Sequence, residues 1–449
     1  METTSASPGS LAWEERPTRA IVRLSAPVVV SMLSYSAMTL VDTLFVGRLG
    51  AAALAGVGLG SLIAFGLACF SIGLLRSIKI LVSQAAGAGR REAAPDVLGA
   101  GLVLALVLGL LTAVFGVLVA PLAASLAGGG AAGSAASSYL VVRVLGTPLV
   151  LAYTALRETR YGLGDSRSPM VASLAANVAN VGLDALFLLV LDLGVVGAAL
   201  ATNVACLIEA GLIALSQRKD GFRFGAVRRY LRPLFSLGLP AGLQFLLEVG
   251  SFTLLGAMIA RMGEMQMAAH QIAVQVLHFV FLPAFAIAEG ASVLAGQAIG
   301  AGRRHLVVPV AVRAFGVAGS YAVICGAIFL AGGRWILSLF SADGALLAVA
   351  FQLLAVGAVM QVFDAANIVA RGVLRGTSDV RIPALAGILT AWLATPPLAW
   401  FFGIHLGLGA VGGWIGLCVE ILAGALFFWG RLWLRHRAPA PQLVPAPAA

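Results

Sequence analysis

The segment SQAAGAGRR at residues 83–91 returns as GQAIGAGRR at residues 296–304, 213 residues later in a chain of 449. Other landmarks recur in the same order, as LSAPVVV (24–30) does in LGLPAGL (237–243). Ordered landmarks at a nearly constant offset indicate an internal duplication. The sequence therefore predicts two related halves of about 200 residues each.

Composition indicates that the bilayer is the solvent for much of this chain. Hydrophobic residues make up 60% of it and charged residues only 11%, which is too little charge for a soluble protein of this length. A helix needs about 20 apolar residues to cross a membrane. Twelve such stretches are predicted, at 20–46, 54–80, 96–121, 135–157, 168–191, 195–216, 232–260, 270–299, 306–330, 346–370, 382–402 and 408–430.

Six spans per half return the chain to the same side, so both halves have the same orientation. Repeats of this kind are related by an axis along the membrane normal. We therefore expect an all-α polytopic membrane protein with two six-helix lobes around a central cleft. The predicted divisions are a cytoplasmic tail (1–19), an N-lobe (20–216), a cytoplasmic linker (217–231), a C-lobe (232–434) and a disordered cytoplasmic tail (435–449).

The net charge of +10 has a membrane explanation. Basic residues gather at the span ends of one side, whereas the other side carries little beyond Arg48, Arg261 and Arg334. This asymmetry follows the positive-inside rule and places both termini in the cytoplasm. A nucleic-acid partner is therefore not expected.

Charged side chains inside the predicted spans need a reason, because each costs about 2.5–3.5 kcal/mol or more in the bilayer. Asp42 lies in the first span. Asn177, Asn180 and Asp184 share one face of the fifth span, being three and four residues apart. With Thr202 of the sixth span, Asp42 and Asp184 lie about 10 Å inside the outer face, so these residues can converge on one site.

Two carboxylates, an amide and a hydroxyl can bind Na⁺, and two adjacent carboxyls can instead take up a proton. The alternative is that these groups only bond helices to one another, which we favour for Asn177 alone. The positions equivalent to Asp42 and Asp184 in the second half are Leu255 and Leu398. The fold therefore does not require the two acids.

In the C-lobe, Glu248 and Asp364 are candidates to line the cleft and bind cationic substrates or cations. Their alternative is an isolated protonated or bonded group. No second group is expected near Glu209, Glu289 or Glu420, and Arg143 is expected to pair with a neighbouring helix. Pro27, 15 residues before Asp42 on the same span, is a candidate hinge, or else a fixed kink.

Four segments, VDTLFVGRLGAAALAGVGLG (41–60), NVANVGLD (177–184), GQAIGAGRR (296–304) and RGVLRGTSDVRIP (371–383), resemble the multidrug and toxic compound extrusion (MATE) family. The resemblance covers about residues 20–435. It implies a V-shaped two-lobe fold in a bacterial plasma membrane and export of drugs or toxic metabolites by H⁺ or Na⁺ antiport. It implies no cofactor and a functional monomer.

Within the family, Asp42, Asn180, Asp184 and Thr202 match the N-lobe cation site of the DNA-damage-inducible-protein-F-like branch. Glu248 and Asp364 match acidic cation-binding positions of the other main bacterial branch. The chain therefore carries the cation-binding residues of both branches, and the resemblance leaves the coupling ion open between H⁺ and Na⁺.

Three other functions are weighed. A major facilitator exporter also has twelve spans, but the segment SQAAGAGRREAA (83–94) lacks its Gly-rich Asp–Arg signature. A lipid-linked oligosaccharide flippase of the same superfamily would favour a cationic interior for its pyrophosphate lipid. An enzyme is not expected, because no His-Glu-x-x-His motif, paired metal motif or Ser/His dyad occurs in the spans.

Overall fold

The computed structural model describes residues 11–436, and these residues form helices without a strand. The α-helices are α1 (Pro17–Gly47), α2 (Ala51–Leu75), α3 (Ser77–Gly87), α4 (Ala94–Leu126), α5 (Gly130–Leu145), α6 (Thr147–Gly162), α7 (Arg167–Asp184), α8 (Gly194–Gln217), α9 (Val227–Ala260), α10 (Glu264–Gly300), α11 (Val307–Ser338), α12 (Gly344–Gly376), α13 (Arg381–Leu393), α14 (Thr395–Leu398) and α15 (Gly409–His436). Short 3₁₀ turns η1 (Arg91–Ala93) and η3 (Arg304–Leu306) and π-helical segments η2 (Ala185–Val190) and η4 (Ala399–His405) complete them.

Eleven helical segments of the described chain are long and apolar enough to cross a membrane, and there are twelve if a bent pair counts as one span. The bent pair is α5 and α6, which meet at an angle of 46° around Gly146. The predicted all-α polytopic class is therefore confirmed. The fourth predicted span (135–157) differs in being broken into two helices.

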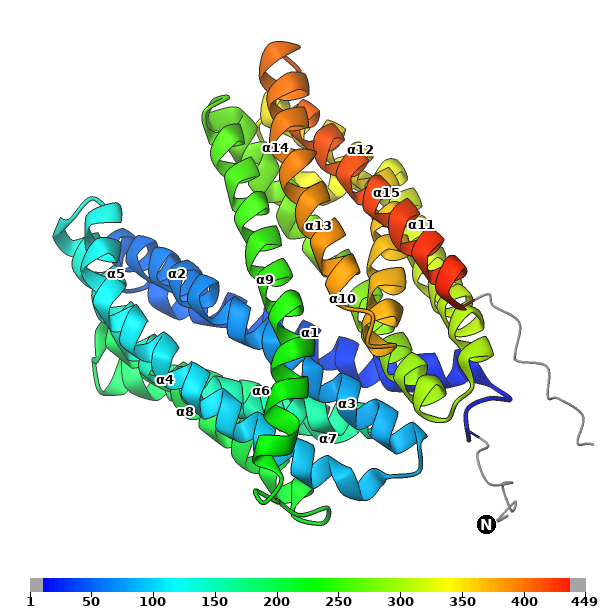
Figure 1. Ribbon diagram of the computed structural model, residues 1–449. Helices are drawn as coiled ribbons and strands as arrows, with labels where there is room; N and C mark the ends of the chain where they lie inside the picture. The colour runs from blue at the N-terminus through cyan, green and yellow to red at the C-terminus, as the bar shows by residue number, and fades with distance from the viewer. Residues whose placement is uncertain (1–10, 437–449) are drawn as a thin grey trace, which may run out of the picture.

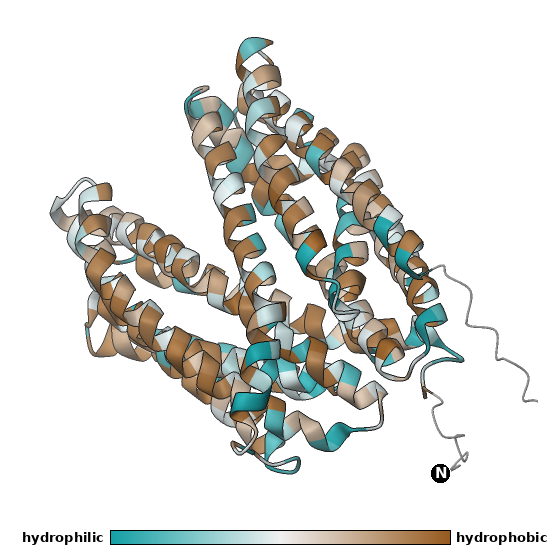
Figure 2. Ribbon diagram, viewed as in Figure 1, coloured by the Kyte–Doolittle hydropathy of each residue, from teal (hydrophilic) through white to brown (hydrophobic). Residues whose placement is uncertain are grey.

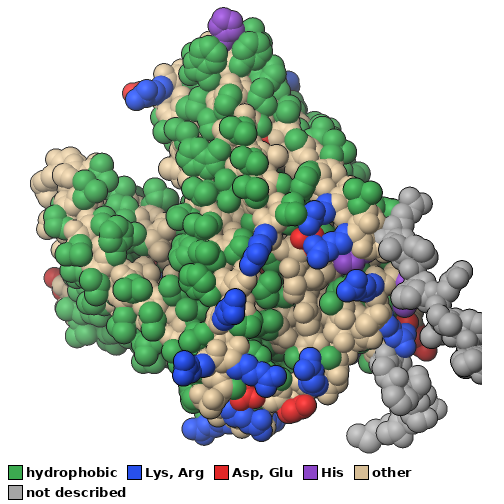
Figure 3. Space-filling model, viewed as in Figure 1, with side chains coloured by type: hydrophobic (Ala, Val, Ile, Leu, Met, Phe, Trp, Pro, Cys, Tyr) green, Lys and Arg blue, Asp and Glu red, His purple; other side chains and the backbone are tan. Residues whose placement is uncertain are grey.

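The first-half helices build one lobe and the second-half helices build the other (Figure 1). The lobes meet at a common base, where α3 packs on α10 and α2 packs on α9, and they diverge toward the opposite end. The space-filling view shows an open gap between the diverging ends (Figure 3). The molecule therefore has the expected V shape.

The ends of the predicted segments differ slightly from the observed helices. Helix α1 begins at Pro17, inside the predicted tail 1–19, and α9 begins at Val227, inside the predicted linker 217–231. Helix α15 reaches His436. The rest of the predicted disordered tail 435–449 lies outside the described residues.

The outer faces of both lobes are apolar. Leu118, Val178 and Leu434 are 71%, 74% and 87% exposed, and Figure 2 shows hydrophobic residues along both lobes with hydrophilic ones concentrated at the base. Apolar exposure on this scale is unfavourable in water but favourable against lipid tails. The chain is therefore a multi-pass membrane protein.

Candidate cation and substrate site

The polar face predicted for the fifth span lies on α7, which packs between α1 and α8. Asn177, Asn180 and Asp184 are 8%, 0% and 0% exposed. Polar groups this deep in a membrane lobe need partners, because an unsatisfied polar group costs several kcal/mol in hydrocarbon. Their hydrogen bonds therefore decide which of them are available to a ligand.

The carboxyl groups of Asp42 of α1 and Asp184 of α7 lie within electrostatic reach of each other. Asp42 Oδ1 and both carboxyl oxygens of Asp184 are buried and have no hydrogen-bond partner among the described residues. Neither carboxyl forms an ion pair within 4.0 Å in the described part of the chain. Arg143 lies within electrostatic reach of Asp42 without bonding it. Two adjacent carboxyls without a bonded counter-ion repel each other when both are charged, so one bound cation or proton would stabilise them.

Asn180 lies one helical turn before Asp184. Both polar atoms of its side-chain amide are buried and lack a partner among the described residues. The amide oxygen is therefore free to bind a cation beside the two carboxyls.

The other two predicted residues are already bonded. The Asn177 amide donates to Ser34 Oγ of α1 at 2.9 Å. The Thr202 hydroxyl donates to the carbonyl oxygen of Ala198 at 3.0 Å, within α8. Asp42, Asp184 and Asn180 thus form the free core of the candidate site, whereas the polar groups of Asn177 and Thr202 are bonded elsewhere.

Arg143 at the end of α5 makes the contact with a neighbouring helix expected of it. Its Nη1 donates to Asn203 Oδ1 of α8 at 2.6 Å, and Asn203 Nδ2 donates to the Val142 carbonyl at 2.6 Å. A Cβ at Gly146 would lie 2.2 Å from Asn203 Oδ1. The break between α5 and α6 therefore fits a glycine, and it lets Asn203 approach the backbone.

The π-helical segment η2 starts directly after Asp184, and η4 starts directly after Leu398, its equivalent in the second half. π-Helical turns often mark functional positions. Because both halves contain one, the turn belongs to the duplicated fold. The carboxyl at its start is particular to the N-lobe.

In the C-lobe, Glu248 of α9 is held by a base. Arg371 Nη1 of α12 donates to Glu248 Oε1 at 2.5 Å, and Gln244 Nε2 donates to the same oxygen at 2.8 Å. Asp364 of α12 lies within electrostatic reach of both Glu248 and Arg371. The two predicted C-lobe acids, Glu248 and Asp364, thus lie in one group, and Arg371 in that group partly neutralises them.

Glu420 of α15 joins this group, contrary to the expectation that nothing converges on it. It lies within electrostatic reach of Glu248, Asp364 and Arg371, and Thr390 Oγ1 donates to Glu420 Oε1 at 3.4 Å. Arg371 directly follows the predicted span 346–370, so the sequence predicted it at the end of the span and not among the acids of the lobe.

The expectation that Glu209 and Glu289 lack partners is wrong. Ser173 Oγ donates to Glu209 Oε1. Lys79 Nζ donates to Glu289 Oε2. Lys79 interrupts the apolar run SIKILV (77–82). A lysine in such a run indicates a buried charge that needs an acidic partner.

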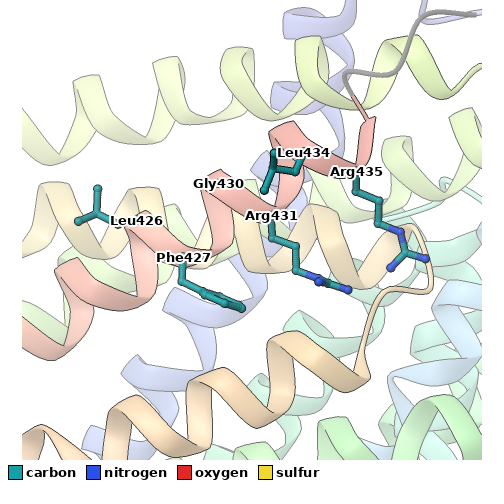
Figure 4. A pocket seen from close by; sticks show the side chains of 6 residues that line it. All are labelled: Leu426, Phe427, Gly430, Arg431, Leu434 and Arg435. Carbon is teal, nitrogen blue, oxygen red and sulfur yellow. The ribbon is translucent and has the colours of Figure 1, made fainter.

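A separate groove runs along α15, lined by Leu426, Phe427, Gly430, Arg431, Leu434 and Arg435 (Figure 4). It contains no acidic side chain among these residues. Both arginines are bonded to Asp379, at 2.7 Å in each case. The groove therefore has no acidic side chain among its lining residues that could bind a cationic ligand.

Pro27 is buried inside α1. The next residue, Val28, packs in one cluster with Tyr161 of α6 and Ala286 of α10. The candidate hinge thus lies where α1 contacts helices of both lobes.

Comparison with known proteins gives one consistent family. The family model described as MatE matches residues 27–186 and again residues 240–401, once in each half. The "Probable multidrug resistance protein NorM" of Pseudomonas syringae pv. tomato is 30% identical over 448 residues, covering 95% of this chain and 97% of that protein. The protein of the same description in Deinococcus radiodurans is 31% identical over 436 residues, covering 94% and 96%.

Solved structures show the same fold. One is described as "Outward-facing conformation of a multidrug resistance MATE family transporter of the MOP superfamily", with a TM-score of 0.87 at 23% identity, covering 94% of this chain and 96% of that one. A transporter of the same superfamily from Pyrococcus furiosus also gives 0.87 at 23% identity, with the same coverage. The two-lobe architecture is therefore shared.

Proposed function

Because this chain belongs to the MATE family of transporters, we propose that it exports small molecules across the membrane in exchange for a cation. The multidrug resistance relatives support export of drugs or toxic metabolites. The V-shaped pair of lobes supports alternating access, in which the lobes rock around a central site. No cofactor takes part in this proposal, and one chain is the transporting unit.

The observation that carries the proposal is the Asp42–Asp184 pair, two buried carboxyls within electrostatic reach of each other, neither of which is bonded to a base among the described residues. The pair can hold one proton between its two acids, because the second charge is unfavourable beside the first. The pair would take up a proton from the open side and release it on the other side, and this cycle of protonation would be coupled to the movement of the lobes. We propose H⁺ as the coupling ion.

Na⁺ is the second candidate, favoured by Asn180. Its unpartnered amide oxygen beside Asp184 would complete a set of oxygen ligands with the two carboxyls. Thr202 would join them only by releasing the Ala198 carbonyl. Asn177 serves in either case to anchor α7 to α1.

The substrate class proposed is cationic or amphipathic small molecules. Glu248, Asp364 and Glu420 outnumber the two bases near that C-lobe group, Arg371 and Arg375, so that region attracts positive charge. A pyrophosphate-linked lipid would be repelled there, which disfavours the flippase alternative. Membership of the MATE family sets aside the major facilitator alternative.

We propose that the protein lies in the inner membrane of a bacterium. The base of the V and both termini face the cytoplasm, and the open end faces the outer side of that membrane. Lys and Arg side chains gather at the base (Figure 3), as the positive-inside rule requires. The segment 217–231 is then the cytoplasmic linker between the lobes at 20–216 and 232–434. Pro27 is the proposed hinge.

The test uses purified full-length protein in liposomes loaded with a cationic dye. A pH gradient and a Na⁺ gradient are imposed in separate experiments, with Asp42→Asn as the inactive reference. We expect the pH gradient to drive dye against its own gradient. Drive by Na⁺ alone would replace H⁺ with Na⁺, and drive by neither would refute antiport.

A further inference from the structure

The two lobes cross at the base through glycines that are equivalent in the repeat. A Cβ at Gly87 of α3 would lie 2.0 Å from the carbonyl oxygen of Gln297, and a Cβ at Gly300 of α10 would lie 2.0 Å from that of Gln84. Gln84 and Gln297 are also equivalent in the repeat. The crossing of α3 and α10 therefore lies on the pseudo-two-fold axis, with the two backbones in direct contact.

Polar bonds join the lobes around this crossing. Gln84 Nε2 of α3 donates to the Gly376 carbonyl at 2.9 Å and to Ser378 Oγ at 2.8 Å, both in the C-lobe. Trp13, just before α1, donates through Nε1 to Gln297 Oε1 of α10 at 2.8 Å. The base is thus closed by specific contacts and not only by apolar packing.

A buried ion pair spans the same contact. Lys79 Nζ of α3 bonds Glu289 Oε2 of α10, and Glu158 Oε2 of α6 lies 3.6 Å from Lys79 Nζ. Lys79, Glu158 and Glu289 are 4%, 2% and 9% exposed. The pair therefore joins a helix of one lobe to a helix of the other, away from water.

The repeat explains how opposite charges meet there. The first-half position equivalent to Glu289 is Arg76, which carries the opposite charge. Arg76 lies within electrostatic reach of Glu289 and stacks over Phe245 and Phe285 of the C-lobe, at 5.1 and 5.3 Å from the ring centroids. At the axis, Lys79 and Arg76 of the first half thus meet Glu289 of the second half, and Arg375 of the second half also lies within electrostatic reach of Glu289.

A buried pair of this kind is stable only while both partners stay together, because each charge alone in a low-dielectric site is strongly destabilising. Opening the base would separate α3 from α10 and break this ion pair, leaving Lys79 with only Glu158 of its own lobe. We propose that Lys79 and Glu289 form a latch that keeps the base closed while the opposite end is open. The latch rests on the proposed transport function only in that the base must open during the cycle.

The test measures the distance across the base directly. Spin labels are placed at Arg91→Cys and Arg304→Cys, two exposed, repeat-equivalent positions on the two lobes, in full-length protein whose four native cysteines are replaced. We expect one short-distance population in the parent. Glu289→Gln should raise the ratio of long to short distances about tenfold or more, because it leaves Lys79 without its cross-lobe partner.

A matched control breaks an ion pair inside one lobe. Arg431→Gln removes bonds of 2.7 and 2.9 Å to Asp379, and both residues belong to the C-lobe. It should leave the distance distribution unchanged. An equal shift in this variant and in Glu289→Gln would refute the latch, since general destabilisation would then explain both.

If Glu289→Gln does not fold, the double variant Lys79→Met/Glu289→Gln replaces it, because it removes both charges. Glu158 keeps its 3.0 Å ion pair with Arg157 in that variant. The latch predicts the same shift toward long distances. A distribution identical to that of the parent would overturn it. The distance measurement needs no transport, so its failure is distinguishable from failure of antiport.

Discussion

The two lobes share a fold but differ in whether their buried acids are bonded to a base. In the N-lobe, Asp42 and Asp184 interact with each other, and Arg143 is bonded to Asn203 instead. In the C-lobe, Arg371 bonds Glu248 directly at 2.5 Å. An acid bonded to a base gains less from a bound cation than a pair of acids without such a bond. This contrast supports our proposal that cation coupling belongs to the N-lobe.

The largest expected effect is that of Asp42→Asn. Without this carboxyl the pair loses its mutual repulsion and its means of binding a cation, so export of cationic dyes from a pump-deficient host should fall to background. The amount of protein in the membrane, measured by immunoblot, should stay within about twofold of the parent. The reason is that an amide is nearly isosteric with the carboxyl it replaces.

The control for this prediction is Asp343→Asn, which changes an exposed carboxyl at the start of α12 in the same isosteric way. Export by this control should match the parent. Full protection by Asp42→Asn would overturn the N-lobe site.

A smaller effect is expected for Glu248→Gln. Transport should fall by about tenfold at most, while stability in detergent falls by about 1–3 kcal/mol because Arg371 loses its charged partner and keeps only a neutral amide oxygen as acceptor. The double variant Glu248→Gln/Arg371→Gln should recover most of that stability, as measured by thermal unfolding. If Glu248→Gln were as inactive as Asp42→Asn, the contrast between the lobes would be wrong.

Replacing Asp379, which lies outside the spans, should change the pH dependence of stability and not transport. Burial raises its pKa, but hydrogen bonds from Arg431 and Arg435 outweigh burial and lower the pKa below that of an ordinary aspartate. Its stabilisation is therefore complete above the unfolded-state pKa of about 3.9 and is lost as pH falls through the lower folded-state pKa.

The measurement compares melting temperatures of the parent and Asp379→Asn from pH 7 to pH 3. The variant should be less stable by about 1–3 kcal/mol at pH 7, with a difference that shrinks below about pH 4. A difference that grows with acidity would contradict the assignment.

The smallest expected effect is that of Thr202→Val. Its hydroxyl is bonded to the Ala198 carbonyl, so dye export should change by less than about twofold if the coupling ion is H⁺. A selective loss of Na⁺-driven transport would instead make Thr202 a ligand and favour Na⁺.

Much of the fold was predictable because it depends on local and periodic signals. Apolar stretches of span length and the repeat around residues 83–91 and 296–304 predicted the twelve spans and the two lobes. The break at Gly146 had a local signal that the span prediction did not use, because Pro148 at the start of α6 interrupts helical hydrogen bonding. Helix spacing also placed Asn177, Asn180 and Asp184 on one face.

The partners of single charges were less predictable. Glu289 bonds Lys79, which lies 210 residues away in the other half, and no local spacing brings these residues together. Glu420 and Arg371 likewise converge only through the packing of α12, α15 and α9. Contacts between distant helices depend on tertiary packing, which a single sequence does not display.

The glycine crossing on the pseudo-two-fold axis has a consequence for the history of the chain. In a symmetric dimer of two identical halves, a residue close to the axis faces its own copy. An ancestor with arginine at both Arg76 and Glu289 positions, or with glutamate at both, would have opposed like charges at its base. The opposite charges seen there can be encoded only after the ancestral sequence was duplicated and the two copies diverged, so duplication preceded this contact.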